Sequence, residues 1–128
     1  MANSINKVVI QKLLKKVEDD YYMAEKYYSI ISTINDLKLT QREIQLISFI
    51  AVKGNISYSN VKDEFCKRFD SSSATIYNMI SKLKKINVLV KDNSKLKVNP
   101  IILIDFKKNI KLEIDLQHIT DNIEKDEN

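Results

Sequence analysis

The scarcity of glycine limits what this chain can fold into more than any other feature of its sequence. Gly54 is the only glycine and Pro100 the only proline in 128 residues. A Walker loop or a dinucleotide-binding fingerprint needs at least two glycines where the backbone approaches phosphate. The sequence therefore excludes glycine-rich phosphate-binding loops.

Side chains for metal binding and catalysis are equally scarce. His118 is the only histidine and Cys66 the only cysteine, so one chain cannot supply the ligands of an ordinary zinc site. A Ser-His-Asp or Cys-His catalytic group would have to use His118, and no neighbouring pattern supports that use. We therefore expect a protein that is not an enzyme, with no metal, cofactor or small-molecule substrate.

The length of the chain suits one compact domain. We expect a single domain at residues 1–119, with a core at 39–98 and additions at 7–36 and 100–117, followed by a charged tail at 120–128. No run of about 18 apolar residues and no signal-peptide pattern is visible. With a single cysteine, these features favour a cytoplasmic protein that has no membrane segment.

Positive charge is concentrated in the middle of the chain. The formal net charge is +4, and residues 53–98 hold ten basic and four acidic side chains. The preceding residues are nearly balanced and the following ones are acidic. This distribution indicates a polyanionic partner. A solvated lysine-rich surface, or the lysine bias of a low-GC genome, would produce the same pattern.

Two segments near the ends of the chain have strand-like patterns. Residues 7–17 are rich in β-branched side chains and favour a strand, although a helix through Ile10 and Val17 also fits. Residues 110–116 alternate cleanly between apolar and charged side chains, which predicts a strand. We expect this strand to pair with the earlier one.

An amphipathic helix is predicted for residues 20–36. Acidic side chains at Glu18, Asp19 and Asp20 suit its first turn, where the helix dipole favours anions. Apolar side chains recur at three- and four-residue steps, at Ala24, Tyr27, Tyr28, Ile31 and Ile34. The tyrosines could stack on bases, but packing in the core or against a partner is favoured. We expect this helix to be the surface of a homodimer.

Two further helices are predicted in the first part of the core. Thr40 and Glu43 have the spacing of a capping box at the start of one helix, which Gly54 ends. Residues 56–58 can add a short extended segment, and a serine then begins the next helix. The side chains expected to point inward from this helix are Val61, Phe65 and Phe69.

A last helix and a hairpin complete the core. The helix is predicted for residues 72–86, and its inward face holds Ile76, Met79, Ile80, Leu83 and Ile86. Two short alternating runs around a polar tip predict a hairpin over residues 88–98. We expect one face of it to hold Val88, Val90, Leu96 and Val98. Asn99 and Pro100 then predict a short helical turn.

The order helix, helix, serine-rich turn, helix and hairpin resembles the winged helix-turn-helix superfamily. The residues that carry the resemblance are 39–47, 61–69, 72–89 and 91–95, about half of the chain. The additions at the two ends are similar to those of small phage-encoded proteins of this class. The resemblance implies a mainly α fold with a small β component (α+β).

In this superfamily the helix at residues 72–86 would be the recognition helix, and the hairpin would be the wing. The resemblance implies a nucleic-acid-binding face formed by Ser72, Ser73, Thr75, Asn78, Lys82, Lys85, Lys91 and Lys95. Hydroxyls in the first turn can donate to phosphates, and Asn78 can bond adenine N6 and N7. The lysines, with Lys84 at the edge, would follow the phosphate backbone.

The predicted recognition helix contains no arginine. Because arginine to guanine is the commonest specific contact, the sequence favours phosphate contacts and AT-rich double-stranded DNA. We expect a DNA-binding transcriptional or replication accessory factor of a phage or mobile element, in the host cytoplasm and dimeric. The alternative is a structural or protein-interaction module, for example in a virion, which Asp92 in the predicted wing favours.

Overall fold

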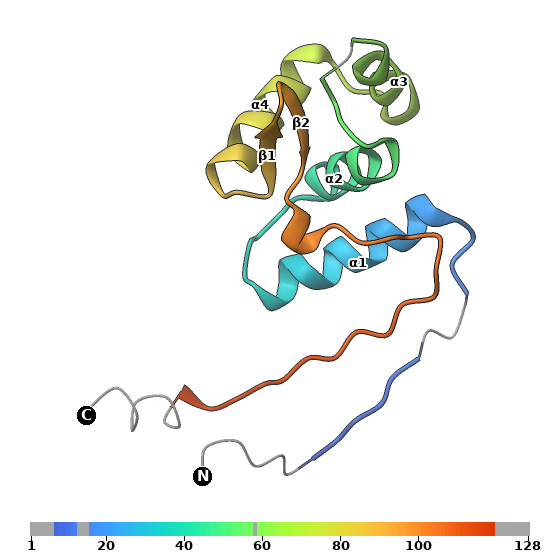
Figure 1. Cartoon of the computed structure of the whole chain (residues 1–128), viewed down its shortest axis with the longest axis vertical. Helices are drawn as coiled ribbons and strands as arrows, with labels where there is room; N and C mark the ends of the chain where they lie inside the picture. Colours follow the sequence, from blue (N-terminus) through green and yellow to red (C-terminus); the bar gives the residue numbers. More distant parts are fainter. Residues whose placement is uncertain (1–6, 13–15, 58, 120–128) are drawn as a thin grey trace. The chain divides into compact units, whose positions relative to one another are not determined.

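The computed structural model describes residues 7–12, 16–57 and 59–119 (Figure 1). Its elements are α1 (Asp20–Ile34), α2 (Gln41–Lys53), α3 (Ser59–Phe69), α4 (Ser73–Lys85), β1 (Leu89–Asp92), β2 (Lys95–Val98) and the 3-10 helix η1 (Pro100–Ile102). The expected mainly helical α+β class is confirmed. No helix in the described ranges has both the length and the apolar character needed to cross a membrane.

The chain divides into two compact units. One is Val17–Asn109, which contains all of the elements named above, and the other combines Met1–Lys16 with Ile110–Asn128. The first unit carries the helices and the hairpin and is described first.

Helix α1 begins at a side-chain cap and packs against α2. Asp19 accepts a hydrogen bond from the Tyr22 backbone N–H at 3.0 Å, and Asp20 lies in the first turn. The buried residues of α1 are Tyr21, Ala24, Tyr28 and Ser32. The predicted stripe is therefore wrong at Ile34, which is 46% exposed because the helix ends there. Within this stripe Ala24 and Tyr28 are buried in the chain and Tyr27 and Ile31 are half-buried, so the homodimer surface on α1 stays a prediction.

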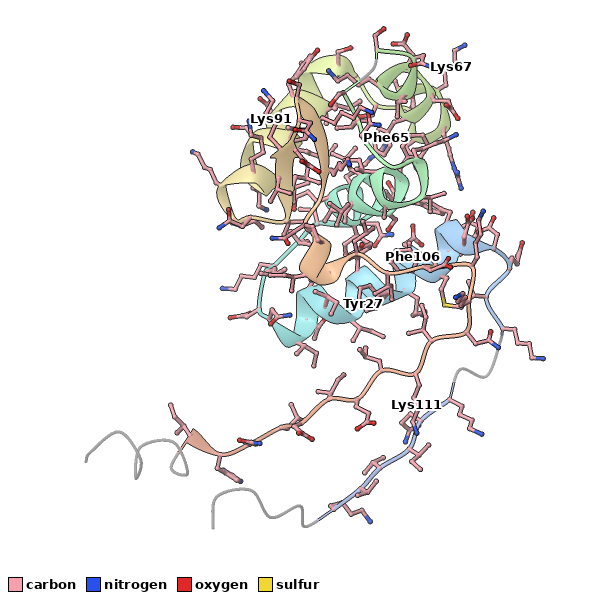
Figure 2. All side chains as sticks on the ribbon, in the orientation of Figure 1. Tyr27, Phe65, Lys67, Lys91, Phe106 and Lys111 are labelled. Atoms are coloured by element: carbon pink, nitrogen blue, oxygen red, sulfur yellow. The ribbon has the colours of Figure 1, made fainter. Side chains whose placement is uncertain are left out.

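The tyrosines of α1 join the segment that follows the hairpin. The Tyr28 hydroxyl donates to the Ile102 carbonyl at 2.8 Å. The rings of Tyr27 and Tyr28 lie 5.6 and 5.5 Å from the ring of Phe106, and Figure 2 shows Tyr27 beside Phe106. Desolvation by burial raises the pKa of the Tyr28 phenol above its ordinary value. These side chains form part of the core.

Helix α2 lies at the centre of the unit and contacts α1, α3 and β2. Its capping box is present as predicted, because the Thr40 side chain accepts from the Glu43 N–H and the Glu43 carboxylate accepts from the Thr40 N–H. Gly54 ends the helix with φ of 102°, a backbone conformation that residues other than glycine rarely adopt. The buried apolar residues of α2 are Ile44, Leu46, Ile47, Phe49 and Ile50.

Helix α3 is attached to α2 by aromatic packing. Phe65 is fully buried (Figure 2), and its ring lies 5.4 Å from Phe49 and 4.7 Å from Phe69. Of the three predicted inward residues, Val61 and Phe69 are half-buried. Asp70 then reverses the chain with φ of 51°. This turn brings α4 against α3.

Helix α4 begins and packs largely as predicted. Ser72 is its N-cap, and the buried residues are Ile76, Met79, Ile80 and Leu83. The prediction is wrong at Ile86, which is 39% exposed. Ile86 is the C-cap, and Asn87 after it turns the chain with φ of 62°, so this position no longer follows the helical face.

The hairpin forms, but with a different register from the predicted one. Asn93 and Ser94 occupy a two-residue turn with φ of 51° and 69°, as a type I′ turn requires. This turn pairs Leu89 with Val98 and Lys91 with Leu96. Because opposed residues share a face, the prediction that Val88 and Val90 lie with Leu96 and Val98 is wrong. The position of the turn determines the register.

One backbone bond extends the hairpin toward the α2–α3 connection. The Ile56 N–H donates to the Leu96 carbonyl at 3.1 Å, and the Ser57 hydroxyl accepts from the Leu96 N–H at 2.7 Å. The predicted extended segment thus contributes one backbone hydrogen bond, at Ile56, and forms no strand, while Tyr58 lies outside the described residues.

In the second unit neither predicted strand forms. Residues 7–12, 16 and 110–118 have no strand assignment, and the one sheet among the described residues is β1–β2. The apolar side chains of both segments are largely exposed. A two-stranded ribbon is at best marginally stable when nothing covers it, which accounts for the wrong prediction. Residues 13–15 of the first predicted strand, and the predicted tail at 120–128, lie outside the described residues.

We expect Tyr28→Phe to lower the free energy of unfolding by about 1 kcal/mol, because it leaves the Ile102 carbonyl without its hydrogen-bond donor. Urea unfolding followed by circular dichroism measures the change. Tyr22→Phe is the matched control, since Tyr22 is 45% exposed, and it should leave the unfolding midpoint unchanged. Equal effects of the two substitutions would contradict the core role of Tyr28.

Candidate nucleic-acid interface

The outward side of α4 is basic and polar. The helix sequence contains three lysines and no acidic residue. Its buried residues face the core, and the remaining side chains are exposed. All eight residues predicted for the interface are exposed, namely Ser72, Ser73, Thr75, Asn78, Lys82, Lys85, Lys91 and Lys95.

The first turn of α4 is fixed by its own serine cap. The Ser72 hydroxyl accepts from the Thr75 N–H at 3.2 Å and shares a hydrogen bond with the Thr75 hydroxyl at 2.9 Å. Ser72 therefore holds the helix end in place, and its role as a phosphate donor stays a prediction. The backbone N–H groups of Ser73 and Ala74 begin the helix, where such groups favour anions.

Asn78 lies one turn further along the exposed face. Thr75, Asn78, Lys82 and Lys85 are separated by three- and four-residue steps, so they form one stripe along α4. The Asn78 side chain makes no hydrogen bond to another described residue. Its amide can therefore present a donor and an acceptor together, as adenine recognition requires.

Lys82 has a partner that the sequence did not reveal. Its Nζ lies 2.9 Å from Glu43 Oε1, and the two side chains are 44% and 8% exposed. Desolvation raises the pKa of Glu43, but hydrogen bonds from the Thr40 N–H and from Lys82 outweigh it and hold the pKa below its ordinary value. Lys82 thus links α4 to the capping box of α2, in addition to lying on the predicted interface.

Three lysines project from α4 and the hairpin without an acidic partner among the described residues. They are Lys84, Lys85 and Lys91, the last of which is labelled in Figure 2. Asp92, the acidic residue of the hairpin, lies 3.5 Å from Lys97 across the turn and opposes Lys95 in the register. The negative charge of Asp92 is therefore balanced within the hairpin itself.

The structure adds Lys62 and Tyr77 to this surface. Tyr77 is 56% exposed on α4, and the Lys62 Nζ on α3 lies 3.4 Å from its hydroxyl and 4.8 Å from its ring centre. Neither Tyr77 nor Lys62 is among the residues predicted for the interface. Only the packing of α3 against α4 brings the two together.

Both arginines make contacts within the fold, on α2 and α3. Arg42 on α2 donates to the Phe69 carbonyl at the end of α3. The Arg68 guanidinium lies 4.2 Å from the Tyr21 ring centre and 5.2 Å from that of Phe69, which are cation–π distances. Neither arginine belongs to α4 or the hairpin, so the positive charge there comes from lysine.

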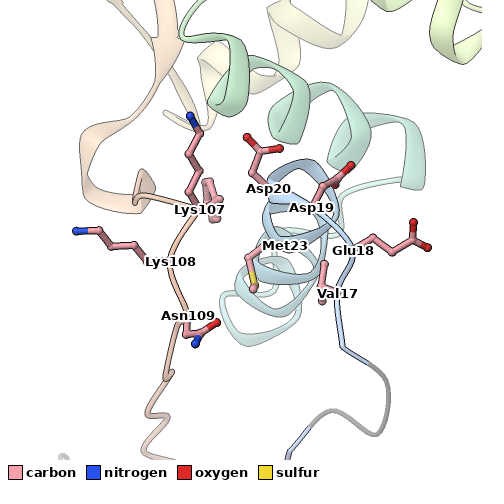
Figure 3. A pocket seen from close by; sticks show the side chains of 9 residues that line it. Val17, Glu18, Asp19, Asp20, Met23, Lys107, Lys108 and Asn109 are labelled. Atoms are coloured by element: carbon pink, nitrogen blue, oxygen red, sulfur yellow. The ribbon is translucent and has the colours of Figure 1, made fainter.

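A shallow pocket of about 340 Å³ lies elsewhere on this unit (Figure 3). Its lining consists of Val17, Glu18, Asp19, Asp20, Met23, Phe106, Lys107, Lys108 and Asn109. Asp19 already serves as the cap of α1, and the lining mixes both signs of charge. Across the described ranges, no cluster of three or more His, Cys, Asp or Glu side chains could hold a metal ion.

The Glu43 carboxylate predicts how stability changes with acid. Because its pKa is lower in the folded chain than the ordinary 4.5, its contribution is present above that pH and is lost as the pH falls through the folded value. We expect Glu43→Gln to be less stable than wild type at pH 7, with a smaller loss on acidification. Chemical unfolding at several pH values measures both effects.

Glu64→Gln, which removes the exposed ion pair with Lys53, is the control and should change the stability little. The same acid dependence in wild type and Glu43→Gln would contradict this assignment.

Comparisons with family models, with curated proteins and with solved structures find no match to this chain. The case for a function therefore rests on the residues and their arrangement.

Proposed function

We propose that this chain is a winged helix-turn-helix protein that binds double-stranded DNA, with α4 as the recognition helix and β1–β2 as the wing. The succession of α2, α3, α4 and hairpin supports the proposal. The packing of α4 against α3 and of the hairpin against α2 and α4 supports it as well.

The exposed side of α4 is the observation that carries this proposal. It combines a helix start with backbone N–H donors, a central amide and several lysines, and it contains no carboxylate. Half or more of the hydrogen bonds in protein–DNA complexes go to phosphate and sugar. A face of this composition suits a polyanion better than it suits the mixed charges of an ordinary protein surface.

Each part of the face has a separate role. Ser73 and Thr75 hold a phosphate at the start of the helix, and Asn78 contacts adenine in the major groove. Lys84, Lys85 and Lys91 contact the sugar–phosphate backbone on either side. Because no arginine is present to bind guanine, the preferred site is rich in A·T pairs.

The cellular role that fits is a transcriptional or replication accessory factor of a phage or mobile element. One α4 would read only a half-site, so a dimer is the expected active form. The abundance of lysine over arginine, which suits an AT-rich genome, agrees with this setting.

A protein-interaction or structural module is the second candidate, and a specific observation favours it. Arg42, Arg68 and Lys82 all make contacts within the chain. Fewer cations are thus available for DNA than the net charge indicates. In that case the same face would dock on an acidic protein surface, for example in a phage particle.

A double charge reversal of the lysines at the end of α4 tests DNA binding. Lys84→Glu/Lys85→Glu should abolish binding to an AT-rich duplex, measured by fluorescence anisotropy at two salt concentrations. Wild-type affinity should fall steeply with salt, with a slope of roughly −3 for three phosphate contacts. These two lysines are preferable to Lys82, whose reversal would also break its bond to Glu43.

Lys26→Glu/Lys38→Glu is the matched control, because it makes the same charge change on α1 and the loop after it. This variant should bind DNA with close to wild-type affinity. If wild type fails to bind at low salt, or if the two double variants weaken binding equally, the DNA-binding proposal is wrong and the protein-interaction candidate gains support.

Asn78→Ala tests base reading separately from affinity. Loss of one bidentate contact should cost about 1–3 kcal/mol of discrimination at one A·T position. Binding to a duplex of random sequence should be nearly unchanged, since phosphate contacts remain. A selection from randomised duplexes, performed with both proteins, measures the preference. An identical preference in the variant would exclude Asn78 as the reading residue.

A further inference from the structure

Apolar and charged side chains alternate without exception over residues 110–116, yet this described segment forms no strand. The apolar positions, which would share one face of a strand, are Ile110, Leu112, Ile114 and Leu116. Ile114 is 43% exposed and Leu116 is 87% exposed. Figure 1 shows the segment as an extended trace. An exposed, extended segment with an apolar side is ready to pair with another strand.

We propose that two copies of this chain associate by antiparallel pairing of residues 110–114, with Leu112 of each copy on the two-fold axis. In this arrangement Lys111 of one copy opposes Glu113 of the other, and Ile110 opposes Ile114. Each contact occurs twice, as a closed two-fold interface requires. This inference does not depend on DNA binding.

The charges of the segment select this partner and this register. With Leu112 on the axis, Lys111 (Figure 2) meets Glu113 twice and Asp115 meets the neutral Asn109, so no like charges oppose each other. A register centred on Glu113 would also oppose Lys111 and Asp115, but it would place two carboxylates opposite each other on the axis, which destabilises a strand pair. A parallel, in-register pair of these segments would place each charged side chain beside the same side chain of the other copy, so that like charges would meet.

The N-terminal segment supplies the outer strands. Residues 7–12 carry Lys7 and Lys12 around the exposed apolar residues Val8, Val9 and Ile10, and they have no acidic residue. Residues 110–116 have an acidic excess, from Glu113 and Asp115 against Lys111. Two strands alone are marginal, whereas four strands share an apolar face. Lysines on the outer strands then limit growth beyond the dimer.

Sedimentation velocity of the full chain, from low micromolar to several hundred micromolar, tests the proposal. Wild type should convert from monomer to dimer, with a gain in β signal by infrared spectroscopy. Leu112→Asp should abolish the dimer, since it places two carboxylates on the axis. Lys111→Glu and Glu113→Lys should each weaken dimerisation by about tenfold, because two cross-strand attractions become repulsions.

An equal mixture of Lys111→Glu and Glu113→Lys chains should recover wild-type dimerisation, since their heterodimer again opposes unlike charges. Lys26→Glu, on α1, is the control and should dimerise normally. Circular dichroism of the helices verifies that each variant is folded. A wild type that stays monomeric, a dimer that tolerates Leu112→Asp, a mixture no tighter than the single variants, or assemblies larger than a dimer would each overturn the proposal.

Discussion

The carboxylate of Glu43 joins the start of α2 to α4. This side chain is 8% exposed, and it accepts from the Thr40 N–H at 2.8 Å and from Lys82 at 2.9 Å. A charge removed from water is costly unless it is paired and hydrogen-bonded, so both partners are needed. The bond to Thr40 starts α2, while the bond to Lys82 holds α4 beside it. The burial of the apolar side of α4 then directs Ser73, Asn78 and Lys85 outward.

Local signals in the sequence predicted the helices and their starts. The Thr40–Glu43 spacing concerns residues only three apart, and the structure confirms the capping box. The wrong predictions for the strands concern contacts between one segment and another. Alternation at residues 110–116 identified an apolar side but not whether any layer covers it. The hairpin register was wrong because the location of the turn, rather than the apolar pattern, decides which residues oppose.

The sequence predicted which side chains of α4 are exposed, because helical periodicity alone determines that. Once Ile76, Met79, Ile80 and Leu83 were assigned inward, the other side of α4 followed, and the eight selected residues are exposed. The bonds of these side chains were not predictable, because Lys82–Glu43 and Lys62–Tyr77 join residues far apart in sequence. Such pairs depend on how helices pack, which periodicity does not encode.

The central claim is that α4 and the hairpin together form a face for a polyanion. Amide chemical-shift mapping of the isotope-labelled chain, titrated with an AT-rich duplex, tests it most directly. The account predicts the largest shifts at residues 73–78 of α4 and 91–95 of the hairpin, with α1 nearly unchanged. Shifts concentrated on α1 or on residues 100–109, or no shifts at low salt, would contradict it.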